Sequence, residues 1–223
     1  MYDFARGPLM WVAAIVFAAG VFYRMVQLFV LTRKKEPLLY AGGGTERAVG
    51  RSAEERKLER LAAFQNSLLG RHPVVAIVST VFHTCLFMAP VFLVAHNLLL
   101  YESWGFSFMS LPDAVCDVMT VILLAGGLFF LLRRLVVPQV AAVSSPYDYI
   151  LLLVTTAPFL TGFFAYHQLF DYRTVLILHM LSGELMLVAV PFTKLGHMVF
   201  FFFVRLLVGG EYSLGRGNRT WSA

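Results

Sequence analysis

Six histidines are the residues best suited to chemistry in this chain, and four of them lie deep inside long apolar stretches. His83 and His96 share one stretch, and His179 and His197 share another. Ionisable or metal-ligating side chains are costly inside a membrane, so they are functional candidates there. A neutral imidazole is a good ligand for iron. The four histidines therefore suggest a cofactor held between two helices.

The expected directions of the two stretches sort the histidines by depth. One stretch is expected to run from the inner to the outer side of the membrane, and the other runs back. His83 and His197 then share the inner half (the inner pair), and His96 and His179 share the outer half (the outer pair). Each pair suits the iron of one b-type haem, with the imidazoles as axial ligands to the metal. The alternative is that the histidines only form hydrogen bonds between helices.

Helix geometry gives this pairing a test. His179 and His197 are 18 positions apart, which is about five turns or about 27 Å of one continuous helix, so they would face the same way. His83 and His96 are 13 positions apart, with an angular offset of about 140°. That offset is poor for one straight helix. Pro90 lies between His83 and His96, and Pro191 lies between His179 and His197. A proline kink in each helix would change the angle between its two histidines.

The remaining ionisable residues in or near the apolar stretches have weaker assignments. His72 precedes Pro73 at the inner surface, where we expect a surface residue, with haem ligation as the alternative. His167 lies in a short outer loop and is expected to be solvated. Further candidates are Arg24 and Lys194, which would pair with haem propionates or reach the lipid headgroups, and Glu184, which would accept a proton from a quinol or pair with an arginine.

The composition indicates which elements must position these residues. The chain of 223 residues is 59% apolar and 14% charged, with a mean hydropathy of +0.73. A soluble domain is about 45–50% apolar and about 25% charged. These values exclude a disordered chain, a nucleic-acid-binding domain and a typical soluble enzyme. Five stretches are long enough to cross a bilayer as helices, which predicts an all-α membrane bundle with spans at about 8–32, 73–101, 114–132, 147–166 and 174–208.

The positive charges predict the orientation of this single membrane domain, which covers residues 1–223. The loop 33–72, the turn 133–146 and the C-terminal tail together hold 14 lysines and arginines, against 2 on the opposite side. The N-terminus is therefore expected outside and the C-terminus inside. In the inner loop 33–72, Ser52 and Glu55 could begin a short surface helix, which would lie on the membrane or dock an inner partner subunit.

The two cysteines, Cys85 and Cys116, lie in apolar stretches and form no CxxC motif. This spacing encodes neither a zinc or iron–sulfur site nor a covalently attached c-type haem. We expect buried free thiols.

Several motifs resemble the respiratory nitrate reductase gamma-subunit family. They are Gly20 to Arg24, Phe82-His83 with His96, the turn Leu132 to Pro138 followed by Asp148, Leu178-His179, and the run Pro191 to His197. The run Pro191 to His197 and its 18-residue spacing from His179 are the most specific. The resemblance implies a di-haem cytochrome b with five spans and an outside N-terminus.

The departures from that family point to one branch of it. The spacing of His83 and His96 is longer than in nitrate reductases, and the start of the third span has Asp113, Cys116 and Asp117 in place of a lysine that serves the quinol site. The chain also lacks most of a long outer insertion. It looks more like the shorter cytochrome b subunits in transmembrane redox complexes of sulfate-reducing bacteria. That branch implies electron exchange between periplasmic multihaem cytochromes c, or quinones, and a cytoplasmic iron–sulfur subunit.

We therefore expect a multi-pass subunit of the bacterial inner membrane with two haem b groups. It would relay electrons within a respiratory oxidoreductase complex, beside other membrane subunits, without a complete catalytic site of its own. Two alternatives stay open. One is a quinol-oxidising subunit, with menaquinone as a further cofactor and Glu184 or Asp117 at the edge of its pocket. The other is a haem-free membrane anchor or transporter.

Overall fold

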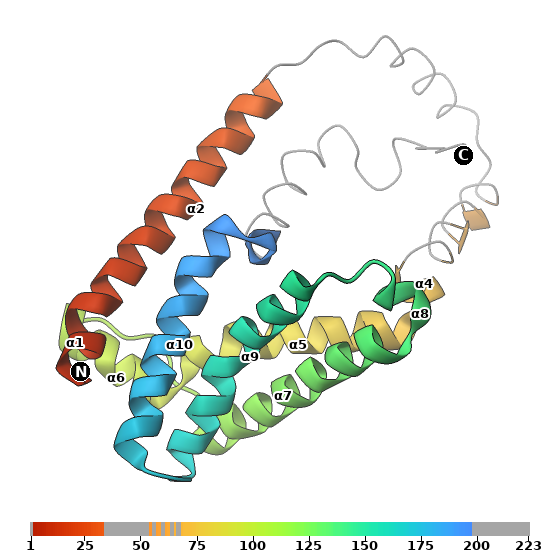
Figure 1. The fold of residues 1–223 in the computed structure, drawn as a ribbon. Helices are drawn as coiled ribbons and strands as arrows, with labels where there is room; N and C mark the ends of the chain where they lie inside the picture. Colours follow the sequence, from red (N-terminus) through yellow and green to blue (C-terminus); the bar gives the residue numbers. More distant parts are fainter. Residues whose placement is uncertain are drawn as a thin grey trace. The chain divides into compact units, whose positions relative to one another are not determined.

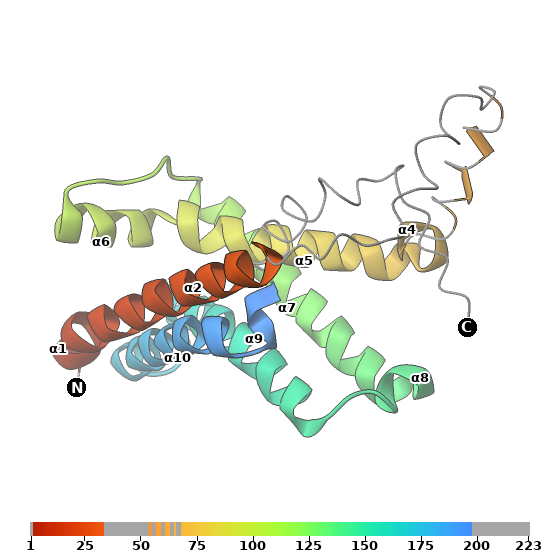
Figure 2. The ribbon, with the colours of Figure 1, turned by 90° about the horizontal axis from the view of Figure 1, so that it is seen from above.

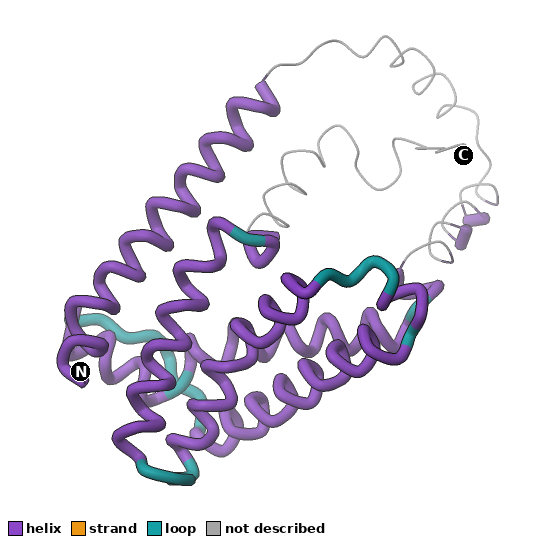
Figure 3. The backbone as a smooth tube through the Cα atoms, viewed as in Figure 1, coloured by secondary structure: helices purple, strands orange, loops and turns teal. Residues whose placement is uncertain are grey.

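The computed structural model describes residues 2–33 and 68–197, together with positions 54, 57, 58, 61, 62 and 65. Within these residues the chain forms helices, turns and loops, with no strand (Figure 3). The predicted surface helix at Ser52 and Glu55, and the predicted extension of the fifth span to residue 208, lie largely outside the described residues.

Five helical segments are long and apolar enough to cross a membrane, which confirms the predicted all-α membrane class. The candidate spans are Tyr2–Val30, Pro73–Phe92, Asp113–Val136, Pro146–Tyr166 and Tyr172–Phe192. The helices in chain order are α1 (Tyr2–Phe4), a π-helical turn (Ala5–Leu9), α2 (Met10–Arg33), α4 (Leu68–Arg71), α5 (Pro73–Phe92), α6 (Val94–Trp104), α7 (Asp113–Val136), α8 (Pro138–Ala141), α9 (Pro146–Tyr166), α10 (Tyr172–Phe192) and a 3-10 turn (Lys194–Gly196) (Figure 1).

Large apolar side chains are exposed along each of these spans. Only 11% of the most apolar window of the first span is buried, and 22% in each of the other four. One exposed example from each span is Phe22, Ile77, Val118, Leu153 and Leu185. Because so much apolar surface would be unfavourable in water, the spans require a lipid environment.

The chain divides into two compact units, which are described separately. The first comprises Met1–Trp11 and Gln65–Met186, and the second comprises Val12–Phe64 and Leu187–Ala223. In the first unit, α5 packs along α7, and α7 packs along α9 (Figures 1 and 2). Glycines allow these close contacts: a β-carbon at Gly126 would lie 3.0 Å from the Phe82 ring, and one at Gly127 would lie 2.7 Å from Thr156.

Polar contacts join the ends of the helices in the first unit. Arg6 forms an ion pair of 3.1 Å with Glu102, and the Trp11 ring lies 5.4 Å from the Trp104 ring. At the turn between α7 and α9, the Arg134 guanidinium donates to Ser144 Oγ at 3.1 Å. These contacts hold the ends of neighbouring helices in the first unit together.

The expected thiol state is confirmed. Cys85 on α5 and Cys116 on α7 are buried and free, so neither takes part in a disulfide.

The second predicted span is interrupted, so the expectation of one kinked helix over 73–101 is wrong. The helix α5 continues past Pro90 and ends at Phe92, Leu93 is extended with φ −68° and ψ 131°, and α6 begins at Val94. Proline removes one backbone donor, but the interruption lies three residues beyond it.

The fifth predicted span is also interrupted, so the assumption of five continuous turns between His179 and His197 is wrong. The helix α10 ends at Phe192, one residue after Pro191. Thr193 is extended with φ −124° and ψ −178°, and a 3-10 turn follows before His197. The helical phase of His179 therefore does not set the direction of His197.

Candidate functional site

The outer pair is brought together in the first unit. The imidazoles of His96 on α6 and His179 on α10 have ring centres 5.9 Å apart and planes inclined by 16°. That separation is too large for two rings in face-to-face van der Waals contact, which lie about 3.5–4 Å apart. Two imidazoles bonded to one metal at about 2 Å hold their ring centres roughly 6 Å apart. The ring-centre separation is thus similar to that of two imidazoles on opposite sides of one metal ion.

Hydrogen bonds fix the tautomer of both rings. His96 Nδ1 lies 2.8 Å from the carbonyl oxygen of Pro90, and His179 Nδ1 lies 2.8 Å from the carbonyl oxygen of Pro158. A carbonyl oxygen only accepts, so each Nδ1 carries the hydrogen and donates it. In the neutral ring, Nε2 then has the lone pair. A carbonyl partner on the other nitrogen is the usual arrangement of a metal-binding histidine.

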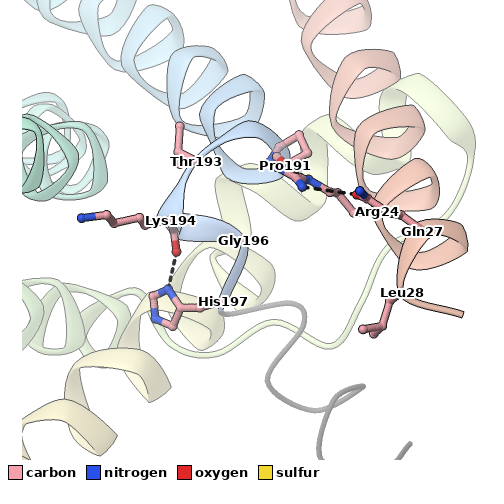
Figure 4. A pocket seen from close by; sticks show the side chains of 8 residues that line it. All are labelled: Arg24, Gln27, Leu28, Pro191, Thr193, Lys194, Gly196 and His197. Atoms are coloured by element: carbon pink, nitrogen blue, oxygen red, sulfur yellow. Dashed lines mark hydrogen bonds between the residues drawn. The ribbon is translucent and has the colours of Figure 1, made fainter. Parts of the chain in front are cut away.

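The two histidines of the inner pair show the same bonding pattern. His83 Nδ1 donates to the carbonyl oxygen of Ser79 at 2.7 Å, within α5. His197 Nδ1 donates to the carbonyl oxygen of Lys194 at 2.7 Å (Figure 4). His83 belongs to the first unit and His197 to the second. All four predicted ligands thus have Nδ1 on a backbone carbonyl, which is the tautomer that leaves Nε2 as the donor atom for a metal.

The two other histidines have different environments. His167, which follows α9, is exposed as expected, and its Nε2 also bonds to Asp117 Oδ1 of α7 at 2.9 Å. His72 is exposed at the N-cap of α5. Asp117, which was predicted at the edge of a quinone pocket, is engaged in the contact with His167.

Gly162 on α9 makes room for the His179 ring. A β-carbon at position 162 would lie 3.0 Å from His179 Cε1 and 3.2 Å from its Nδ1. A carbon–carbon distance of 3.0 Å is well inside the van der Waals contact range of about 3.5–4.0 Å. The glycine therefore lets the imidazole lie flat enough against α9 to reach the carbonyl oxygen of Pro158.

A pocket of about 570 Å³ lies in the second unit, beside His197 (Figure 4). Its lining residues are Arg24, Gln27, Leu28, Pro191, Thr193, Lys194, Gly196 and His197. Arg24 Nε donates to the carbonyl oxygen of Pro191 at 3.1 Å, and its Nη1 donates to Gln27 Oε1 at 3.4 Å. The Arg24 side chain thus holds a carbonyl at the C-terminal end of α10, where a cation is favourable.

The Gly20 to Arg24 motif acts as a unit on Pro191. Four positions apart, the two residues share a face of α2. A β-carbon at Gly20 would lie 2.7 Å from Pro191 Cβ and Cγ. Gly20 therefore allows α2 to approach Pro191, while Arg24 bonds its carbonyl oxygen. In Figure 4 the Lys194 side chain points away from Arg24, so these two predicted propionate partners do not converge on one anion.

Glu184 is the buried acid of the first unit. Its side chain is 5% exposed, and neither carboxylate oxygen has a hydrogen-bond partner among the described residues. Such a group is costly to bury in ionised form. It lies on α10, five residues after His179.

Asn97 is a site residue that the sequence analysis missed. It is 3% exposed, and its amide donates to the carbonyl oxygens of Val91, before the interruption, and of Leu93, at the interruption. A polar residue inside an apolar stretch, directly after a predicted ligand, was the available signal.

The histidines of the outer pair form a two-ligand donor set. No group of three or more His, Cys, Asp or Glu residues that could hold a metal ion occurs in the part of the chain that the structure describes. A bare metal ion in a protein generally takes four or more ligands. Haem iron needs only axial ligands from the protein because the porphyrin supplies the others. Two histidines are the number of protein ligands that haem iron can take.

The five apolar helices define a multi-pass, all-helical membrane protein, with two facing histidines in its first unit. The chain is 35% identical over 222 residues to a protein of Nitratidesulfovibrio vulgaris (strain Hildenborough), with 99% of this chain and 97% of that protein covered. It belongs to the family of that protein. No family model and no solved structure matches the chain.

Proposed function

We propose that this chain is a membrane cytochrome b subunit that binds two haem b groups and relays electrons across the bacterial inner membrane. The observation that carries the proposal is the outer pair. Its ring centres are 5.9 Å apart, and both Nδ1 atoms are bonded to backbone carbonyls. Because each neutral ring uses its one N–H on a backbone carbonyl, neither has an N–H left to donate to the other ring.

The residues of the outer site hold and orient the ligand set. When bound, haem iron supplies reversible one-electron chemistry. His96 and His179 would hold the haem iron through Nε2, and the carbonyl oxygens of Pro90 and Pro158 fix their tautomer. Gly162 keeps the face of α9 open for the His179 ring.

His83 and His197 are proposed as the axial ligands of the second haem. The proposal is supported by their shared tautomer and by the inner half of the membrane that the sequence predicts for both. Arg24 and Lys194 remain proposed partners of its propionates. Arg24 has five N–H donors and uses only part of them on Pro191 and Gln27.

The proposed partners are a periplasmic multihaem cytochrome c and a cytoplasmic iron–sulfur subunit. The relative from Nitratidesulfovibrio vulgaris supports this assignment, because it comes from a sulfate-reducing bacterium, in which complexes of the resembled branch occur. The basic segment 33–72 supplies nine lysines and arginines for an acidic surface on an inner partner.

The relay can be tested with the purified chain in phospholipid vesicles that contain trapped ferricyanide. A membrane-impermeant reductant is added outside, and loss of ferricyanide is followed optically. The proposal predicts rapid loss with the wild-type chain, together with a b-type reduced-minus-oxidised spectrum. His179→Ala should stop the transfer, whereas His167→Ala should retain it. A wild-type chain without a b-type spectrum would contradict the proposal.

Glu184 favours a second candidate function, oxidation of a quinol. A quinol releases protons as it is oxidised, and a buried carboxylate without a partner among the described residues is a suitable acceptor. This candidate predicts that a menaquinol analogue reduces the isolated chain and that Glu184→Gln slows that reduction at least about a hundredfold, the lower range of general-base effects. Failure of the analogue to reduce the wild-type chain would exclude it.

A further inference from the structure

The interruption between α5 and α6 leaves three successive carbonyl groups, those of Pro90, Val91 and Phe92, without a helical partner, and the first unit satisfies each of them. Pro90 O accepts from His96 Nδ1 at 2.8 Å, and Val91 O accepts from Asn97 Nδ2 at 3.0 Å. Phe92 O accepts from the backbone N–H of Leu111 at 2.9 Å. Leu93 O accepts from the backbone N–H of Asn97 at 3.0 Å and from Asn97 Nδ2 at 3.2 Å. Unpaired carbonyls would be costly in the membrane, so these bonds stabilise the interruption.

Asn97 is the residue that connects the parts of this arrangement. Its Nδ2 group donates to the last turn of α5 and to Leu93, and its Oδ1 accepts from the backbone N–H of Phe108 at 2.8 Å. One buried carboxamide therefore joins the end of α5, the first turn of α6 and the loop 105–112. The carboxamide uses its Nδ2 group as a donor and its Oδ1 as an acceptor. An acid or an apolar side chain of similar size could therefore not form the same set of bonds.

The interruption decides where the His96 ring points. His96 is the third residue of α6, and its Nδ1–H bonds to a carbonyl that an unbroken helix would use internally. In a continuous helix, the residue at position 96 would be displaced around the axis by about 140° from His83. The interruption therefore gives His96 a direction that the helix α5 alone would not give it.

We propose that Asn97 is the positioning residue of the outer haem ligand His96, an inference that rests on the proposed haem function. Its carboxamide holds the chain open at Leu93, fixes the orientation of the His96 imidazole relative to His179, and ties the loop 105–112 to the same point. The predicted consequence is specific. Loss of the carboxamide changes the outer haem and leaves the inner haem as it was.

Two variants separate the functions of the amide. Asn97→Leu removes both donor and acceptor, and Asn97→Asp keeps the acceptor for Phe108 N–H but loses the donor to Val91 and Leu93. The control is Thr155→Val, because Thr155 is also buried in the first unit but bonds only to Leu151 O of its own helix. The electron paramagnetic resonance signal of a ferric haem with two imidazole ligands depends on the angle between their planes. It therefore reports the orientation of His96 directly.

The proposal expects both Asn97 variants to shift or abolish the outer haem signal and to weaken haem retention there at least about tenfold, as for other residues that orient metal ligands. The inner haem signal and the Thr155→Val protein should stay unchanged. Unchanged outer signals in Asn97→Leu would overturn the proposal. Equal changes at both haems would also overturn it, because they would indicate general destabilisation.

A second readout does not depend on haem. In the haem-free chain, hydrogen exchange of the Phe108 and Leu111 amides and the nitrogen-15 signal of His96 Nδ1–H report the same bonds. Asn97→Leu should speed both exchanges and remove the slow His96 signal. If the wild-type chain binds no haem but Asn97→Leu still shows these changes, the proposed function is wrong while Asn97 still positions His96. If they do not occur, the positioning role is wrong.

Discussion

The His179 ring packs tightly against Gly162: a β-carbon at position 162 would lie 3.0 Å from His179 Cε1. This relationship between α9 and α10 connects the packing of the two helices to the direction of a proposed haem ligand. A small change at Gly162 should therefore be felt first at the outer haem.

Gly162→Ala is predicted to weaken haem binding at the outer site. Overpacking costs about 1–3 kcal/mol, which corresponds to roughly a 5- to 150-fold change in affinity. The matched control is Gly183→Ala on α10, because a β-carbon there would meet nothing within 4 Å. Both changes gain helix propensity equally, so only the crowding of His179 differs. Haem titration of the two purified proteins measures the effect, and equal affinities would contradict it.

Arg24→Ala is predicted to destabilise the chain because α2 loses its bond to Pro191 O. A hydrogen bond with a charged donor contributes about 1.5–3 kcal/mol, which lowers the melting temperature by about 3 °C or more in a protein of this size. Arg6→Ala is the control, since the exposed Arg6–Glu102 ion pair is worth about 0–1 kcal/mol. Thermal unfolding in detergent, followed by circular dichroism, compares them. A larger decrease in melting temperature for Arg6→Ala than for Arg24→Ala would contradict this role of Arg24.

Asp171 is predicted to make stability depend on pH in the acid range. Its carboxylate caps α10 by accepting from Thr174 N–H at 2.9 Å and Thr174 Oγ1 at 2.6 Å, and these bonds lower the pKa of Asp171 below its ordinary value of 3.8. Because the pKa is lower in the folded chain, the stabilisation is complete above about pH 3.8. It is lost as the pH falls further, through the folded value.

The measurement is the unfolding temperature of the wild-type chain and of Asp171→Asn from pH 5 to pH 2. An asparagine retains an N-cap acceptor but has no carboxylate to titrate, so its curve should fall less steeply below pH 3.8. Parallel curves would show that Asp171 does not contribute.

Much of the architecture could be predicted because hydropathy and length determine where a bilayer can be crossed. The five spans follow from apolar runs of about 20 residues, and five such helices are present in the part of the chain that the structure describes. The depth argument predicted that His96 and His179 would meet, and the two rings do lie together. Depth is a one-dimensional property, so the order of residues along each helix was sufficient for it.

The local breaks could not be predicted from spacing. Pro90 and Pro191 signalled disturbed helices, but the chain leaves helical geometry at Leu93 and at Thr193. Their positions depend on tertiary bonds, such as those of Asn97 to Val91 and of Arg24 to Pro191. Such partners are distant in sequence or hidden in apolar runs. For the same reason, Arg24 was predicted only as a propionate partner, although its observed bonds are to Pro191 and Gln27.

The most direct test of the account is haem stoichiometry in a two-residue cycle at the outer pair. The wild-type chain, His96→Ala, His179→Ala and the double variant are purified, and haem per chain is measured by the pyridine haemochrome method. If the two imidazoles share one iron, the wild type retains two haems, and each single variant and the double variant all retain one. Loss of one haem by each single variant and of both by the double variant would contradict the shared site.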